Sequence, residues 1–291
     1  MASAVTPERI LLLGDAELVT RLGIDPNAAV LRVEDWDELC TRLVREHPAS
    51  LVLVDVRISL DAVERLREVL KRFPSVTIIP VLLARPTDAV RLRSLLDAGA
   101  SDFLDLGRGN GAVDVILRSA RGRPFKRTLE AHVTRFLDAD ARVLLAAAAE
   151  VAVSGGGVTE LARKFGVNPR TLVGWCARTA LPEPRRLQAW MRVLLASQLL
   201  DDPGRTMWDV AVACGYSTDR SLRRIIKELL GTEMEVRALR RAGVFATAIQ
   251  SFNAELRTLR EDRRRGRSVQ PGKVVVPMQT SEVCVTPPPR A

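Results

Sequence analysis

A short segment of the chain gathers cationic and hydroxyl side chains of the kind that contact a polyanion. Its members, in order, are Ser217, Thr218, Arg220, Ser221, Arg223, Arg224 and Lys227. A guanidinium group can form paired hydrogen bonds to a phosphate or to the edge of a guanine base, and hydroxyl groups add single bonds. The segment is therefore a candidate nucleic-acid-binding surface. The alternative is a solvated surface whose arginines form salt bridges, including to Glu228.

A second, earlier segment repeats the spacing of the first. Residues 161–176 read LARKFGVNPRTLVGWC, and residues 210–226 read VAVACGYSTDRSLRRII. The matching pairs are Ala162 and Ala211, Gly166 and Gly215, and Asn168 and Ser217, each 49 residues apart. The candidate contact residues of the earlier segment are Arg170, Thr171, Val173 and Trp175.

The repeated residues suit two helices joined by a tight turn. The small alanine lets the helices pack closely, and the glycine permits a left-handed backbone in the turn. Asn168 and Ser217 are the expected N-caps, and Pro169 suits the first position of a helix. Each segment thus predicts a helix-turn-helix, whose second helix can lie in the major groove of DNA. Two copies at a fixed offset are a more specific signal than one.

The repeat resembles the AraC-type transcription regulators over roughly residues 143–238. The helix that joins the two motifs in that family is matched by Arg192, Ala196, Leu199 and Leu200. The resemblance implies binding of double-stranded DNA through recognition helices at about 169–178 and 218–229. Three positions depart from the family: Gly174 replaces a basic residue, Cys176 replaces Phe and Met234 replaces Pro. We therefore expect the second motif to supply more of the sequence choice than the first.

The first 120 residues alternate short apolar runs with amphipathic segments of helical length. The runs are 10–13, 28–33, 51–54, 76–83 and 102–106, and the helical stripes lie within 61–72 and, after Thr87 as N-cap, 87–98. Such repeats predict βαβ units on a parallel sheet. Asp15 and Asp55 directly follow two of the runs, at the sheet edge where this architecture places its chemistry.

This region resembles the receiver domain of two-component response regulators, over about residues 8–120. The resemblance rests on three segments: LVLVDVR at 51–57, PVLLAR at 80–85 and AGASDFL at 98–104. It implies that Asp55 is the candidate phosphoacceptor and that Asp15 is one of two acids that would hold Mg²⁺. Together the two resemblances predict an α/β doubly wound, flavodoxin-like domain followed by an all-α domain with two helix-turn-helix motifs.

The receiver-like domain lacks several groups that phosphoryl transfer requires. The second acid falls on Gly14, the hydroxyl residue on Leu83 and the lysine on Leu106. Because carboxylates hold the metal and a cation pairs with the phosphoryl oxygens, their loss weakens both. We expect a degenerate domain that is not switched by phosphorylation, in which Asp55 is a strand-end carboxylate satisfied by a loop amide.

Charge and composition restrict the function further. The formal net charge is +9, with net −3 over residues 1–120 and +12 over residues 121–291, so a polyanionic partner is expected for the second half. The four cysteines show no clustered zinc-ligand spacing, and no enzyme signature or phosphate-binding glycine loop occurs. We expect no enzyme activity, no cofactor and no bound metal. No apolar run is long enough for a membrane span, so we expect a cytoplasmic location without a membrane partner; the excess of arginine over lysine suits a GC-rich bacterial genome.

The expected organisation has five parts. These are a receiver-like domain (1–120), a linker helix (121–142), the double helix-turn-helix domain (143–240), an amphipathic helix (241–265) and a disordered tail (266–291). We also expect a helix break near residues 138–140 and a core or rim position for Trp190 and Trp208. The apolar stripe of residues 244–261 either docks on the protein or pairs with another subunit.

These features give one leading function and two alternatives. The leading hypothesis is a sequence-specific transcription regulator that binds duplex DNA. Its first domain would form a homodimer or contact another protein, and RNA polymerase is a candidate partner. The alternatives are a response regulator phosphorylated at Asp55 and an adaptor whose helix-turn-helix fold no longer binds DNA.

Overall fold

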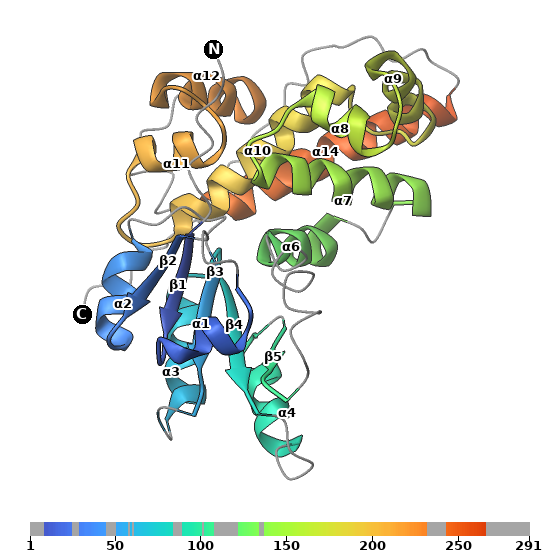
Figure 1. Ribbon diagram of the computed structural model, residues 1–291. Helices are drawn as coiled ribbons and strands as arrows, with labels where there is room; N and C mark the ends of the chain where they lie inside the picture. Colours follow the sequence, from blue (N-terminus) through green and yellow to red (C-terminus); the bar gives the residue numbers. More distant parts are fainter. Residues whose placement is uncertain are drawn as a thin grey trace, which may run out of the picture.

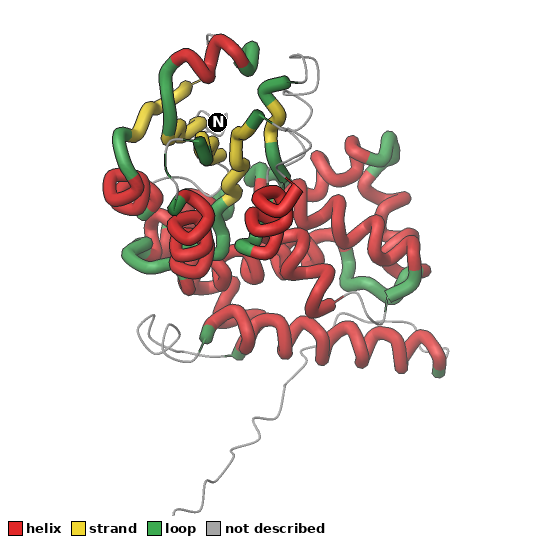
Figure 2. The backbone as a smooth tube through the Cα atoms, turned by 90° about the horizontal axis from the view of Figure 1, so that it is seen from below, coloured by secondary structure: helices red, strands yellow, loops and turns green. Residues whose placement is uncertain are grey.

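The computed structural model gives the chain an α/β region followed by a helical region (Figure 1). It describes residues 9–24, 29–44, 51–57, 59, 61–83, 89–100, 102–107, 122–133, 137–231 and 243–265. The tail at 266–291, and Thr87 and Met234, lie outside the described residues. Viewed from below, the described strands cluster in one part of the molecule and the remainder is helical (Figure 2).

The α/β region contains a five-stranded parallel sheet with the order β2-β1-β3-β4-β5. Its strands are β1 (Arg9–Leu13), β2 (Ala29–Val33), β3 (Leu51–Asp55), β4 (Thr77–Leu82) and β5 (Leu104–Asp105). This is the strand order of flavodoxin-like doubly wound sheets, which confirms the predicted fold class. Each strand coincides with one of the apolar runs, as expected when helices cover both faces of a parallel sheet.

Alternate residues of the central strands supply two separate cores. One core joins Leu11, Leu13, Val52 and Val54 to helices α2 (Trp36–Leu43) and α3 (Ala62–Arg72). The other joins Ile10, Leu12, Leu51 and Leu53 to helix α1 (Glu17–Arg21). Since successive strand residues point to opposite faces, the continuous apolar runs fill both cores.

The predicted stripe of residues 87–98 is only partly correct. Helix α4 (Ala89–Asp97) does form there, and Leu95 is buried in the core. However, Val90 is 78% exposed and Leu96 is 52% exposed. These two side chains lie on the solvent side of α4, because Leu95, together with the half-buried Leu92, defines the side that faces the sheet.

The helical region is built around one long central helix, α10 (Pro184–Asp201) (Figure 1). Around it lie α6 (Arg123–Val133), α7 (Ala139–Val153), α8 (Val158–Lys164), α9 (Pro169–Arg178), α11 (Met207–Ala213), α12 (Asp219–Leu230) and α14 (Val244–Arg264). From Met191 to Leu200 only Arg192 is not fully buried. A helix that is buried on all sides is expected to be apolar on all sides.

The predicted linker helix over 121–142 is instead parts of two helices. The expected break near residues 138–140 is confirmed, because Asp138 is the N-cap of α7 and its carboxylate accepts a hydrogen bond from the amide of Ala141 at 2.8 Å. Phe125 of α6 and Leu144 of α7 both belong to the same core as α10. The proposed boundary between 142 and 143 therefore falls inside a helix of the packed domain.

Helix α14 docks on the body of its own chain. Phe252 packs against Trp190 of α10 with ring centroids 5.2 Å apart. Glu255 accepts hydrogen bonds from Arg186 at 2.6 and 2.7 Å and from the indole of Trp190 at 2.8 Å. Of the two alternatives for this stripe, the structure shows the intramolecular one, and the expected core position of Trp190 is confirmed.

The helical region adjoins the amino edge of the sheet, and the strands point away from it (Figure 1). Asp55 ends β3 and Asp15 follows β1, so both lie on the carboxyl edge of the sheet, away from the helical region of residues 122–265. Among the described residues, no helix combines the length and apolar character that a bilayer span needs.

Candidate nucleic-acid interface

The first helix-turn-helix consists of α8, a turn at Gly166 and α9. Gly166 has a φ of +64°, a left-handed value that a side chain rarely adopts. The carboxamide oxygen of Asn168 accepts a hydrogen bond from the amide of Thr171 at 2.8 Å, and Pro169 begins the helix. The turn glycine, the cap and the proline are all confirmed as predicted.

The second helix-turn-helix consists of α11, a turn at Gly215 and α12. Gly215 has a φ of +76°, again left-handed. The prediction that Ser217 caps α12 is wrong: Thr218 is the N-cap, and its Oγ1 accepts from the amide of Ser221 at 3.2 Å. The second turn is one residue longer than the first, so α12 matches α9 at an offset of 50 residues, as the buried pair Leu172 and Leu222 also shows.

One face of α12 packs into the helical core. Leu222, Ile226 and Leu229 are buried at 0, 3 and 8% exposure. Because an α-helix has 3.6 residues per turn, Arg220 and Arg224 lie on the opposite side, one turn apart, and both are exposed. Lys227, also exposed, continues this stripe by a further turn. We call Arg220, Arg224 and Lys227 the cationic stripe of α12.

Arg223 and Ser221 lie on the flanks of this stripe. Arg223 pairs with Asp219 at 3.3 Å, one turn earlier on the same helix, and both side chains are about half exposed. Ser221 and Thr218 bond each other through their hydroxyls at 2.9 Å. Within the described residues no ion pair is recorded for Arg220 or Arg224. Of the predicted arginines of α12, Arg223 is thus the one whose ion pair lies within the described residues.

The equivalent face of α9 is small and nearly uncharged. With the offset of 50, Arg170 matches Arg220, Gly174 matches Arg224 and Ala177 matches Lys227. A Cβ placed on Gly174 would meet only the end of the Arg178 side chain, at 3.7 Å. This position is therefore open space that a side chain could fill.

The remaining candidates on α9 occupy different positions. Val173 is 44% exposed, beside Arg170. Thr171 is half-buried, and its hydroxyl bonds the cap residue Asn168 at 3.1 Å. Trp175 is half-buried and packs edge-to-face on Phe165 at 5.6 Å, against the helical core. The structure thus gives Trp175 a packing role and leaves Arg170 and Val173 on the exposed face.

Trp208 was expected in the core or its rim, and this expectation is wrong. It is 54% exposed on α11, and Val212, one turn later, is 38% exposed. The signal was present in the sequence, because Met207, Val210 and Ala211 form the buried side of a helix that begins at Thr206. Trp208 and Val212 fall on the other side of that helix.

On the opposite part of the molecule, Asp55 is a buried carboxylate with a cation beside it. Its exposure is 3%, and Arg57 contacts both oxygens at 2.8 Å while the Arg57 amide donates to Oδ1 at 3.0 Å. The hydrogen bond to Asp55 raises the pKa of Arg57. The side chain of Arg57, not only a loop amide, therefore satisfies Asp55.

Among the described residues, those at the positions that the receiver resemblance assigns to the other phosphorylation groups are Gly14, Asp15, Leu83 and Leu106. A Cβ on Gly14 would lie 2.9 Å from the Cβ of Asp55, so an acid at this position has no space. Asp15 is exposed, and its carboxylate accepts from the amide of Glu17 at 3.2 Å. Leu106 packs against the core and Leu83 is 36% exposed. Within the described residues, no group of three or more His, Cys, Asp or Glu side chains is arranged to hold a metal ion.

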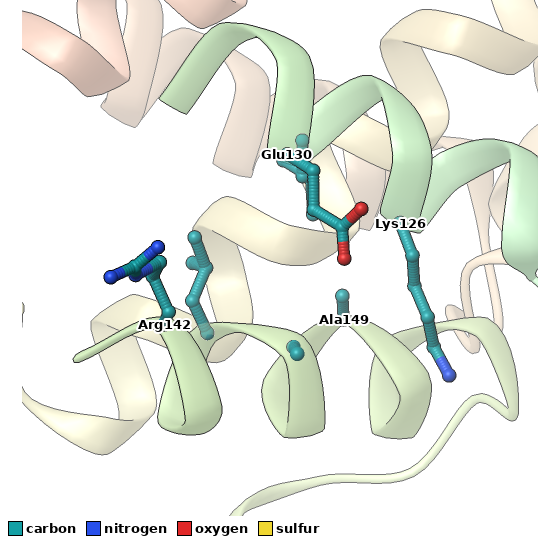
Figure 3. Close-up of a pocket in the computed structure, with 7 residues that line it drawn as sticks. Lys126, Glu130, Arg142 and Ala149 are labelled. Atoms are coloured by element: carbon teal, nitrogen blue, oxygen red, sulfur yellow. The ribbon is translucent and has the colours of Figure 1, made fainter. Parts of the chain in front are cut away.

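A pocket of about 300 Å³ lies between α6 and α7 (Figure 3). Its lining residues are Lys126, Leu129, Glu130, Arg142, Leu145, Ala146 and Ala149. Lys126 binds Glu150 at 2.9 Å, and Glu150 also binds Lys164 of α8 at 2.6 Å. Burial opposes ionisation of Glu150, yet the two lysines lower its pKa. The pocket is thus lined by charges of both signs and is not part of the α9 and α12 faces.

A comparison with protein families agrees with the helical geometry. Residues 161–236 match the family described as "Helix-turn-helix domain", which confirms the predicted AraC-type region. Among solved structures, full-length FixJ from B. japonicum is 16% identical, with a TM-score of 0.36, covering 76% of this chain and 96% of that one. The xylose-binding transcription activator XylR is 12% identical, with a TM-score of 0.34, covering 82% of this chain and 71% of that one. No curated protein matches the chain.

Proposed function

We propose that this chain is a sequence-specific transcription regulator that binds duplex DNA mainly through α12. The observation that carries the proposal is the cationic stripe of α12, exposed on the side opposite the buried Leu222 and Ile226. An arginine in the major groove can form two hydrogen bonds to guanine, which is worth about 1–3 kcal/mol of discrimination against the wrong base. Arg223, paired with Asp219, would contact a phosphate at the flank.

In this proposal α9 makes a weaker contribution. Arg170 supplies one cation, and Val173 offers an apolar contact of the kind that a thymine methyl accepts. Gly174 and Ala177 contribute to the shape of this face of α9 but carry no charge. Helix α9 would therefore position the protein on the second groove segment while α12 selects the sequence.

The α/β domain would act without phosphorylation. Arg57 already occupies both oxygens of Asp55, and Gly14 leaves no space for a second metal-holding acid. The exposed Val90 and Leu96 of α4 give this domain an apolar surface suited to a second copy or to another protein. RNA polymerase is one such candidate, and the exposed Trp208 and Val212 of α11 offer it a separate surface.

Selection of binding sites from a random pool of duplex DNA by the full chain tests the proposal. Recovery of a common site, bound with a steep decrease in affinity as salt rises, is the expected result. Weak binding without a common site would contradict it. That outcome would favour an adaptor whose positive charge gives only generic attraction to DNA.

A further inference from the structure

The α/β domain touches the loop that leads from α10 into the second helix-turn-helix. This loop spans residues 202–206 and ends at Thr206, whose hydroxyl caps α11. One residue of the α/β domain that contacts this loop is Ser75, which lies between α3 and β4. The two sides of the contact are separated by 127 residues of chain. The α/β domain thus contacts the segment that leads into α11.

Three polar side chains form the contact. The hydroxyl of Ser75 donates to Oδ2 of Asp202, and Nε of Arg205 donates to the same oxygen at 3.1 Å. Their exposures are 7% for Ser75, 1% for Asp202 and 3% for Arg205. Burial is the main factor that raises the pKa of Asp202, and Ser75 and Arg205 oppose the rise. A carboxylate and a guanidinium are therefore held out of water at a domain boundary.

The backbone of the same loop fits closely against the α/β domain. Gly204 has a φ of +80°, and a Cβ there would lie 2.6 Å from Cγ1 of Val44, the residue that ends α2. Glycine is therefore the residue that fits at this position without displacing Val44. The loop is thus located by one polar and one steric contact.

The residue before Asp202 fixes a different element. The carboxylate of Asp201, the last residue of α10, accepts hydrogen bonds from the amides of Val244 and Phe245 at the start of α14. Two adjacent acids therefore hold α14 and the α/β domain to the same end of α10. From this end the chain proceeds directly into the second helix-turn-helix.

The contact lies on the opposite edge of the sheet from Asp55. Ser75 precedes β4 and is at the amino edge, whereas Asp55 ends β3 at the carboxyl edge (Figure 1). A buried ion pair adds little stability against an apolar contact of the same shape, but removing one partner is costly. Here both members of the pair, Asp202 and Arg205, belong to the loop, and the hydrogen bond from Ser75 is the polar contact that joins this pair to the α/β domain.

We propose that Ser75, Asp202 and Arg205 form an interdomain clamp that positions the second helix-turn-helix for DNA recognition. Through it the α/β domain acts on α11 and α12 from the amino edge of its sheet, independently of Asp55. Two recognition helices in one chain must meet their grooves together, so a loosened second motif loses affinity for a specific site. The inference rests on the proposed function, and its test separates the two.

The test compares S75A and D202N with D102N in the full chain. Asp102 pairs with Arg123 at 2.6 Å, so D102N alters an interdomain ion pair that touches α6 and not the second motif. The readouts are amide hydrogen exchange of residues 207–213 and affinity for a duplex selected by the native chain. Circular dichroism checks that each variant folds. Because S75A removes only a hydroxyl, it keeps the test informative if D202N does not fold.

The clamp predicts faster exchange in residues 207–213 for S75A and D202N, but not for D102N. Affinity for the selected duplex should decrease about threefold to tenfold, the effect of one lost hydrogen bond. Native exchange in both variants would overturn the clamp even if the chain binds DNA specifically. Faster exchange in a chain that selects no site would support the clamp and contradict the proposed function.

Discussion

Arg57 donates hydrogen bonds to both carboxylate oxygens of Asp55, with Nε 2.8 Å from Oδ1 and Nη2 2.8 Å from Oδ2. Asp55 is the residue that the receiver resemblance makes the phosphoacceptor. Here its charge is neutralised within the chain by a residue only two positions away. The nucleophilic oxygens are thus already paired, in a site where Gly14 excludes a second acid.

A phosphodonor should therefore leave Asp55 unmodified. We expect no phosphoaspartate after incubation of the chain with acetyl phosphate and Mg²⁺, measured by intact mass. DNA binding by D55N should equal that of the native chain under the same conditions. Stoichiometric labelling of the native chain that is lost in D55N would show that Arg57 can move away from Asp55. That result would favour the response-regulator alternative.

Gly174 in the middle of α9 lowers the stability of that helix. G174A should stabilise the helical region by about 1 kcal/mol, because alanine loses less backbone entropy and meets only the end of Arg178. Urea unfolding followed by circular dichroism measures this change. A decrease in stability would mean that the position is less open than its geometry indicates.

Replacing the same glycine with arginine should strengthen DNA binding. G174R would place a cation on the face of α9 that matches Arg224 on α12. Each additional phosphate contact steepens the dependence of log affinity on log salt by about 0.9. G174A is the matched control. An equal slope of log affinity against log salt for the two variants would show that this face of α9 does not contact DNA.

Glu255 should be essential for docking of α14. Its pairing raises the pKa of Arg186, and E255A leaves both Arg186 and the indole of Trp190 without their acceptor. We expect a loss of about 3 kcal/mol in the free energy of unfolding, the lower end for a broken buried pair because Arg186 is partly exposed. Urea unfolding followed by circular dichroism measures the change. A native transition in E255A would show that α14 contributes little to the fold.

Two buried thiols should resist modification in the folded chain. Burial raises the pKa of Cys176 and Cys214 to about 12, so the reactive thiolate is scarce at mildly alkaline pH. Alkylation mapped by peptide mass spectrometry should reach both only after urea is added. Since unfolded thiols ionise near 9.0, stability of the helical region should fall as pH rises from 9.0 toward 12. Rapid alkylation without urea would indicate local opening around α9 or the end of α11.

The elements of the fold were predictable because each is encoded locally. Apolar runs located the strands, and the spacing from Ala162 to Asn168, repeated from Ala211, located both motifs. The family match over 161–236 and the strand order agree with these predictions. Errors of one residue remained where turns differ in length, as at Ser217 and Thr218.

Contacts between distant polar residues were not predictable in the same way. Ser75 and Asp202 have no periodic pattern that relates them, because one hydrogen bond between two domains depends only on how the domains meet. The pairing of Arg57 with Asp55 depends on the path of the chain after β3. The outward position of Trp208 was encoded by the helical period of α11, but large aromatic side chains are usually buried.

In the proposed function, α12 selects the DNA sequence through Arg220 and Arg224. The most direct measurement compares R220Q/R224Q with R67Q/K71Q, which removes the same charge from exposed positions on α3. Affinities of both for the selected duplex and for a scrambled duplex are measured between about 50 and 200 mM salt. We expect R220Q/R224Q to lose about tenfold or more of the discrimination between the duplexes, while R67Q/K71Q retains it. Native discrimination in R220Q/R224Q would show that α12 does not select the sequence.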